Sequence, residues 1–100
     1  MSDSDSKYEV GELVRVACEF TQDGAAIDPD DVFVNVRRPD GRISRSVYGT
    51  DLEVVKDSVG NYHLDVTASA VGWWHYYWFS TGDGQAAEEG KFYVEAVKAR

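Results

Sequence analysis

Apolar and polar residues alternate with a period of two over most of this chain, and turn residues interrupt the alternation at short intervals. A period of two places successive side chains on opposite faces of a β-strand. The segment 13–20 shows the pattern most clearly, and its expected inward residues are Val14, Val16, Cys18 and Phe20. The pattern therefore predicts an all-β chain built from short strands.

Glycines and Asp-Gly pairs divide the chain into seven or eight expected strands, and no long amphipathic helix is predicted. Short strands at this spacing are typical of a sandwich or barrel rather than of alternating β and α units. We expect a two-sheet antiparallel sandwich over residues 7–97, with tails at 1–6 and 98–100. The expected strands lie around residues 8–10, 13–20, 32–37, 42–48, 52–56, 61–67, 73–79 and 91–97. Weak alternation over 42–48 predicts a strand at the edge of its sheet.

The segment 73–79 holds six of the thirteen aromatic residues of the chain. It is too short and too aromatic for a typical helix, so we predict a β-strand. One face of this strand is expected to fill the core, and the other face needs a second partner. The two faces carry Trp74, Tyr76 and Trp78 on one side and Trp73, His75, Tyr77 and Phe79 on the other.

Length and charge narrow the classes of function. One hundred residues make one domain, whose core leaves little room for an internal cofactor. The formal net charge of −8 argues against nucleic acid and anionic membranes, which attract basic proteins. It is compatible with a basic protein partner. The acidic start of the chain lacks the features of a signal peptide, so we expect folding in the cytoplasm.

Several turns and core positions together resemble a known pattern. They occur at residues 8–11, 23–24, 28–29, 38–41, 57–62, 72–78 and 89–94. They are similar to immunoglobulin-like β-sandwich modules in which a Gly-x-Tyr strand precedes a Gly-x-Trp-x-Tyr-x-Trp strand. Macroglobulin-type domains, bacterial Ig-like modules and small proteins of tailed bacteriophages share this pattern. The resemblance covers residues 8–95.

The resemblance implies a fold and suggests a setting. A free-standing chain of this size is most similar to the phage proteins, which implies a head-tail connector accessory, a tail component or a capsid decoration. The expected location is then the host cytoplasm during synthesis and the virion afterwards. The expected partners are other virion proteins or copies of the chain itself, with no cofactor. The chain lacks the paired cysteines of antibody-type domains, since Cys18 is its single cysteine and is expected to be buried.

In an Ig-like topology the strands 32–37 and 91–97 pair with the aromatic strand, so their outward side chains extend its outer face. The expected interface residues are Phe33, Trp73, His75, Tyr77, Phe79 and Tyr93. A contiguous aromatic patch of this kind marks an interaction site, and aromatic residues dominate interface hot spots. Two alternatives remain open. The segment 48–57 folds over this face, or a one-residue slip in register exchanges the two faces.

No catalytic residue or metal ligand is predicted. His63 and His75 are both expected to point outward, toward solvent or an interface, and they lack the further ligands that zinc needs. No serine or cysteine lies in a nucleophile motif. The aspartates of the loop 23–31 do not match an EF-hand, and we interpret them as a solvated turn, with calcium binding as the alternative.

Two further features leave binding functions open. Arg37, Arg38, Arg42 and Arg45 surround one expected hairpin. They form either a solvated tip or a docking site for an acidic neighbour, because arginine is enriched at interfaces. The outward aromatic residues also suit sugar stacking. A carbohydrate- or ligand-binding module is therefore the alternative to a structural virion protein.

Overall fold

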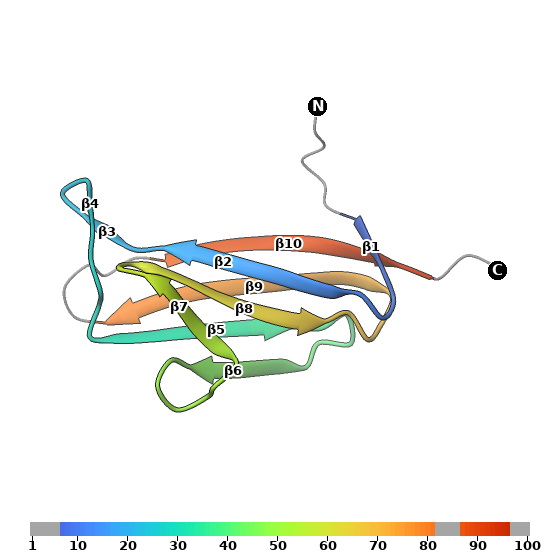
Figure 1. The fold of residues 1–100 in the computed structure, drawn as a ribbon. Helices are drawn as coiled ribbons and strands as arrows, with labels where there is room; N and C mark the ends of the chain where they lie inside the picture. The colour runs from blue at the N-terminus through green and yellow to red at the C-terminus, as the bar shows by residue number, and fades with distance from the viewer. Residues whose placement is uncertain (1–6, 82–86, 97–100) are drawn as a thin grey trace.

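The computed structural model describes residues 7–81 and 87–96, which form ten strands and no helix (Figure 1). The strands are β1 (Lys7–Glu9), β2 (Leu13–Glu19), β3 (Thr21–Gln22), β4 (Ala25–Ala26), β5 (Asp31–Arg37), β6 (Ile43–Val47), β7 (Val54–Ser58), β8 (Asn61–Thr67), β9 (Gly72–Thr81) and β10 (Ala87–Glu95). The expected tails at 1–6 and 98–100, the end of the last expected strand at Val97 and the turn at 82–84 lie outside the described residues.

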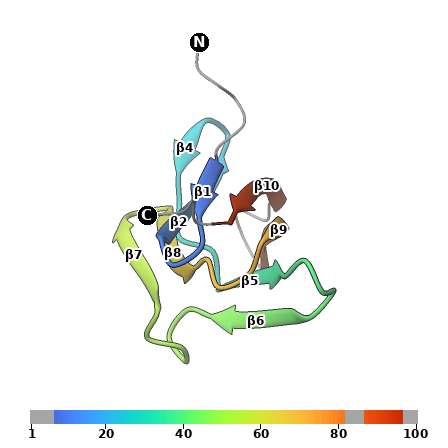
Figure 2. The ribbon, with the colours of Figure 1, turned by 90° about the vertical axis from the view of Figure 1, so that its right-hand side faces the viewer.

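The strands form two main sheets that pack face to face (Figures 1 and 2). One sheet has five strands in the order β1-β10-β9-β5-β6, and the other has three in the order β2-β8-β7. The predicted all-β, Ig-like sandwich is confirmed. Its pairing is antiparallel except at one edge, where β1 runs parallel to β10. After β1 the chain crosses to the other sheet, where the Gly11 amide donates to the Ala68 carbonyl over 2.8 Å.

The core lies between the two sheets and follows the period-two pattern. Inward residues of β2 and β5 are buried while their neighbours in sequence are exposed or half-buried. The β9 indoles of Trp74 and Trp78 are 2% and 0% exposed, and the Trp74 ring stacks on Phe92 with 5.8 Å between centroids. The faces of the aromatic strand are therefore oriented as predicted, and the register slip is excluded.

The prediction of an edge strand at β6 is also confirmed, and the backbone groups at the end of this strand form local hydrogen bonds. The Val47 amide donates to the Asp51 carboxylate over 2.8 Å, and the Val47 carbonyl accepts from the amides of Thr50 and Asp51. An edge strand whose backbone groups are occupied in this way offers fewer sites for pairing with another chain.

The last strand begins four residues earlier than predicted. We interpreted Gly90 as turn punctuation, but it lies inside β10 opposite Tyr76 of β9. A Cβ atom at Gly90 would lie 2.5 Å from Tyr76 Cζ and closer still to its hydroxyl oxygen. The glycine is therefore required because the Tyr76 ring occupies the space of a side chain.

Two smaller differences concern local pairing. The strand expected at 52–56 is Val54–Ser58, because residues 48–53 still belong to the turn that follows β6. The expected turn around Gly24 carries a short hairpin, β3 and β4, which was not predicted as strands because each contributes only two residues. Asp23 and Gly24 at its tip have φ of 54° and 83°. Within residues 7–81 and 87–96 there is no helix of the length and apolar character that a membrane crossing requires.

Candidate interaction surface

The outer face of the five-stranded sheet carries all six residues predicted for the interface. Registers between neighbouring strands place Phe33 opposite Phe79 and Trp73 opposite Tyr93. His75 and Tyr77 lie between these two pairs on β9. Since directly opposite residues of an antiparallel pair point to the same side, the six form one surface. We call it the outer face.

The aromatic side chains of the outer face form two clusters. In the first, which we call the Phe33 cluster, Phe33 stacks on Phe79 with 4.9 Å between ring centroids and Tyr77 stacks on Phe79 at 5.5 Å. The guanidinium of Arg45 lies 5.3 Å from the Phe79 centroid, and its Nε donates to Asn35 Oδ1 over 3.0 Å. Both contacts hold the arginine beside the rings.

The second cluster, the Trp73 cluster, lies toward the other end of the strands. Trp73 meets Tyr93 edge to face with 5.2 Å between ring centroids. The Lys91 ammonium lies 4.7 Å from the Trp73 centroid. In both clusters a cation lies over an aromatic ring. The ring attracts the positive charge and so stabilises it at the surface without a carboxylate partner.

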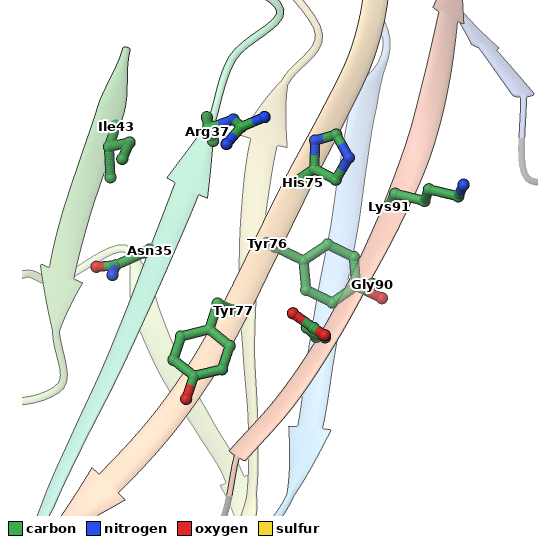
Figure 3. Close-up of a pocket in the computed structure, with 9 residues that line it drawn as sticks. Asn35, Arg37, Ile43, His75, Tyr76, Tyr77, Gly90 and Lys91 are labelled. Carbon is green, nitrogen blue, oxygen red and sulfur yellow. The ribbon is translucent and has the colours of Figure 1, made fainter. Parts of the chain in front are cut away.

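Between the clusters the outer face is hollowed into an open depression of about 580 Å³ (Figure 3). Strands β5, β6, β9 and β10 all contribute to it. Its lining residues are Asn35, Arg37, Ile43, His75, Tyr76, Tyr77, Glu89, Gly90 and Lys91. Gly90 of β10 lies at the hollow, opposite Tyr76 of β9.

No described segment covers the outer face. Trp73 and Tyr77 are 42% and 40% exposed. The segment 48–57, proposed as a possible cover, turns instead toward the other sheet. Its Tyr48 ring lies 5.2 Å from Tyr62 of β8, and its Val54 is buried in the core. Within the described part of the chain, the outer face is thus accessible to a partner.

The four arginines expected to form one patch are divided between different surroundings. Arg37 and Arg45 belong to the outer face. Arg38 lies 5.9 Å from the Trp74 ring centroid, away from that face, and Arg42 approaches Asp40 at 3.8 Å within the β5–β6 turn. Side chains alternate between the two faces of β5 and β6, so arginines that are close in sequence point in different directions. The interpretation of the four arginines as a single patch is therefore wrong.

The prediction of an outward His63 exposed to solvent or an interface is also wrong. His63 is 7% exposed, and its Nδ1 lies 2.8 Å from a carboxylate oxygen of Asp57. Pairing of β7 with β8 shifts register between Lys56 and Ser58. The resulting irregularity places Asp57 beside the imidazole, as a β-bulge commonly redirects a side chain. Sequence periodicity holds no signal for this pair. His75, by contrast, is exposed as predicted.

Two aspartates of the loop 23–31, Asp28 and Asp31, have structural partners. Asp28 accepts hydrogen bonds from Lys56 Nζ at 2.6 Å, the Gly60 amide at 2.8 Å and the Tyr62 hydroxyl at 3.2 Å. The lysine bond, and then the amide bond, lower the pKa of the Asp28 carboxyl. Asp31 accepts from the Thr81 hydroxyl. Among the described residues, no group of three or more His, Cys, Asp or Glu side chains is placed to hold a metal ion.

The single cysteine is inert in its folded surroundings. Cys18 is buried on the inner face of β2, as predicted. Burial, and secondarily the nearby Glu88 carboxylate, raises the pKa of the thiol to about 12. Because the thiolate is the reactive form, this environment suppresses nucleophilic chemistry at Cys18 near neutral pH.

Comparisons with known proteins extend the description of the fold. No protein-family profile and no curated protein sequence matches the chain. Among solved structures, a candidate glycoside hydrolase from Bacteroides vulgatus is similar over 94% of this chain with a TM-score of 0.61 and 14% identity. The chain spans 17% of that protein, so the likeness concerns one part of a much longer molecule. The first Ig domain of Dpr11, solved bound to DIP-gamma, is similar over 96% of this chain with a TM-score of 0.47 and 16% identity. At 14% identity the likeness to the first of these structures concerns the fold and not the activity.

Proposed function

We propose that this chain is a non-enzymatic binding module that acts through protein–protein contacts on the outer face. The observation that carries the proposal is that the two faces of β9 have different roles. One row of its side chains fills the core, while Trp73 and Tyr77 of the other row stay 42% and 40% exposed. Exposed aromatic groups of this size, held by contacts with neighbouring rings, are the usual anchors of interfaces.

The proposed setting is a bacteriophage particle, in which the chain serves as a head-tail connector accessory, a tail component or a capsid decoration. This setting rests on the resemblance of the turn and core motifs to small phage proteins. Its partners would be other virion proteins or further copies of the chain.

Light scattering after size-exclusion chromatography tests the proposal. The chain is measured alone over a range of concentrations and mixed with the products of its neighbouring genes. We expect an association that Tyr77→Ala weakens by about 1–3 kcal/mol, as for a moderate hot spot. Leu52→Ala serves as the control because Leu52 is 92% exposed and lies in the β6–β7 connection, away from the outer face. A chain that stays monomeric and binds none of these products, or an association that Leu52→Ala weakens equally, contradicts the proposal.

A carbohydrate- or ligand-binding module is the second candidate, favoured by the depression between the clusters. The exposed ring of Tyr77 and the polar groups of Asn35, His75 and Glu89 line it together. Sugars bind to such combinations of a flat apolar face and convergent hydrogen-bonding groups. Titration with a panel of glycans, followed by nuclear magnetic resonance, distinguishes the two functions. Saturable shifts confined to this depression support sugar binding, and their absence across the panel counts against it.

A further inference from the structure

The centre of the depression contains a row of basic and titratable side chains. Arg37 of β5 lies opposite His75 of β9, and His75 lies opposite Lys91 of β10. Figure 3 shows the three side chains side by side across these strands. We call them the basic row. Two strand spacings separate its ends, a distance of about 10 Å.

The basic row lacks an acid of its own. Opposite charges that face one another across neighbouring strands stabilise a sheet, yet the position between the two cations holds His75. In the described part of the chain, neither Arg37 nor His75 forms a side-chain ion pair. Lys91 rests on the Trp73 ring instead of a carboxylate. Glu89 is the one acidic residue among those that line the depression, and it stands opposite Tyr77, outside the row.

The rest of the molecule makes this arrangement unusual. The net charge of the chain is −8, and the cations Arg15 and Lys56 on the other sheet are each paired with an aspartate. Among the described residues, cations without an acidic partner are therefore concentrated where the aromatic clusters also lie. Complementary charge at an interface selects partners and orients them.

We propose that the basic row binds carboxylate side chains of a protein partner, presented by an extended acidic segment. This inference rests on the proposed function and specifies the chemistry of its partner. Acidic side chains at alternate positions of an extended segment lie about 7 Å apart on one face, so two of them span most of the row. The planar guanidinium of Arg37 suits bidentate contact with one carboxylate.

The surroundings of the row favour a protein segment over a long polyanion. Ile43 lies beside Arg37 in the register of β5 and β6 and is 64% exposed, which offers apolar contact next to the charges. Asp31 and Glu95 lie on β5 and β10, toward the ends of the same sheet. A sulfated glycan or nucleic acid running along the strands would meet these acids, whereas a short segment that crosses the strands touches only the row.

The test uses two blocked hexapeptides, one alternating glutamate with threonine and one alternating glutamine with threonine. Each is titrated into the labelled protein and followed by nuclear magnetic resonance at low and high salt. We expect the glutamate peptide to shift signals of β5, β9 and β10 around the row, with weaker binding at high salt. Arg37→Gln and Lys91→Gln should each weaken this binding by about tenfold, the effect of losing one charge-assisted contact.

Arg15→Gln is the matched control, since it removes the same charge from the other sheet. Equal loss of binding in Arg15→Gln, or equal binding of the glutamine peptide, overturns the inference. So does a dextran sulfate that binds at the row when the glutamate peptide does not. A protein partner whose binding depends on Tyr77 but not on Arg37 or Lys91 would overturn the acidic chemistry and leave the proposed function standing. A protein partner whose binding does not depend on Tyr77 would instead contradict the proposed function.

Discussion

Trp74 and Trp78 occupy the same buried face of β9, but among the described residues only Trp74 finds a hydrogen-bond partner for its indole N–H. Trp74 Nε1 donates to the Ala70 carbonyl over 3.0 Å. Trp78 Nε1 is buried and has no partner among the described residues. Burial of the unpaired Trp78 N–H costs free energy, whereas the hydrogen-bonded Trp74 N–H does not carry this cost.

The pair provides a matched test of that cost. Phenylalanine removes the N–H group and part of the ring at either position, so both variants lose similar volume. We expect Trp74→Phe to lower the free energy of unfolding by about 1–3 kcal/mol more than Trp78→Phe, because only the former abandons a hydrogen bond. Urea unfolding of both variants measures the difference. Equal losses would show that the Trp78 N–H is satisfied in solution.

Gly90 and Tyr76 give a second prediction. Gly90→Ala should lower the free energy of unfolding by about 1–3 kcal/mol, since a methyl group would overlap the Tyr76 ring. Tyr76→Phe should not relieve the loss, because the ring carbon Cζ is still 2.5 Å from the added atom. Tyr76→Leu in the Gly90→Ala background should recover part of it. A double-mutant cycle from chemical unfolding reports this coupling, and simple additivity would contradict the assigned contact.

The third prediction concerns the Asp28 carboxylate and pH. Its pKa is lowered in the folded state, so its charge stabilises the fold above the ordinary aspartate pKa of about 3.9. That contribution is lost as the pH falls through the lowered folded value. The difference in free energy of unfolding between the wild type and Asp28→Asn should therefore be largest near neutral pH and shrink in acid.

Urea unfolding at a series of pH values from neutral to strongly acidic measures this difference. Asp30→Asn serves as a control because the Asp30 side chain has no hydrogen bond within the described residues, and it should resemble the wild type throughout. A difference for Asp28→Asn that stays constant across the series would show that the lost hydrogen bonds do not depend on the charge of the carboxylate.

Cys18 gives the fourth prediction. With a thiol pKa raised to about 12, the folded protein should react very slowly with a thiol reagent such as dithionitrobenzoate at pH 8. Addition of urea should restore a normal rate as the chain unfolds. The absorbance of the released thiolate measures both rates. Rapid labelling of the folded protein would show that β2 opens locally.

Much of the fold could be predicted because the strands of the two main sheets have one face toward the core. Val14, Val16, Cys18 and Trp74 were placed correctly by alternation alone, which is enforced wherever one face is buried. Gly90 was misinterpreted because the sequence alone does not distinguish a glycine that tertiary packing requires from a glycine that a turn requires. The Tyr76 ring that explains it comes from a neighbouring strand.

The candidate surface could be predicted only in part. Period two identified the aromatic row of β9, and the Ig-like pairing added Phe33 and Tyr93. The basic row depends on register, because Arg37, His75 and Lys91 come from three separate segments. The Asp57–His63 contact depends on an irregular pairing that no periodic pattern encodes.

The parallel pairing of β1 with β10 has a mechanical consequence. Lys7 lies beside Tyr93 and Glu9 beside Glu95, so the first and last described strands run in the same direction. When the two ends of the chain are pulled apart, strands arranged in this way slide along one another, and the backbone bonds between them bear the load together. Such a domain resists tension better than one whose terminal strands peel apart one bond at a time.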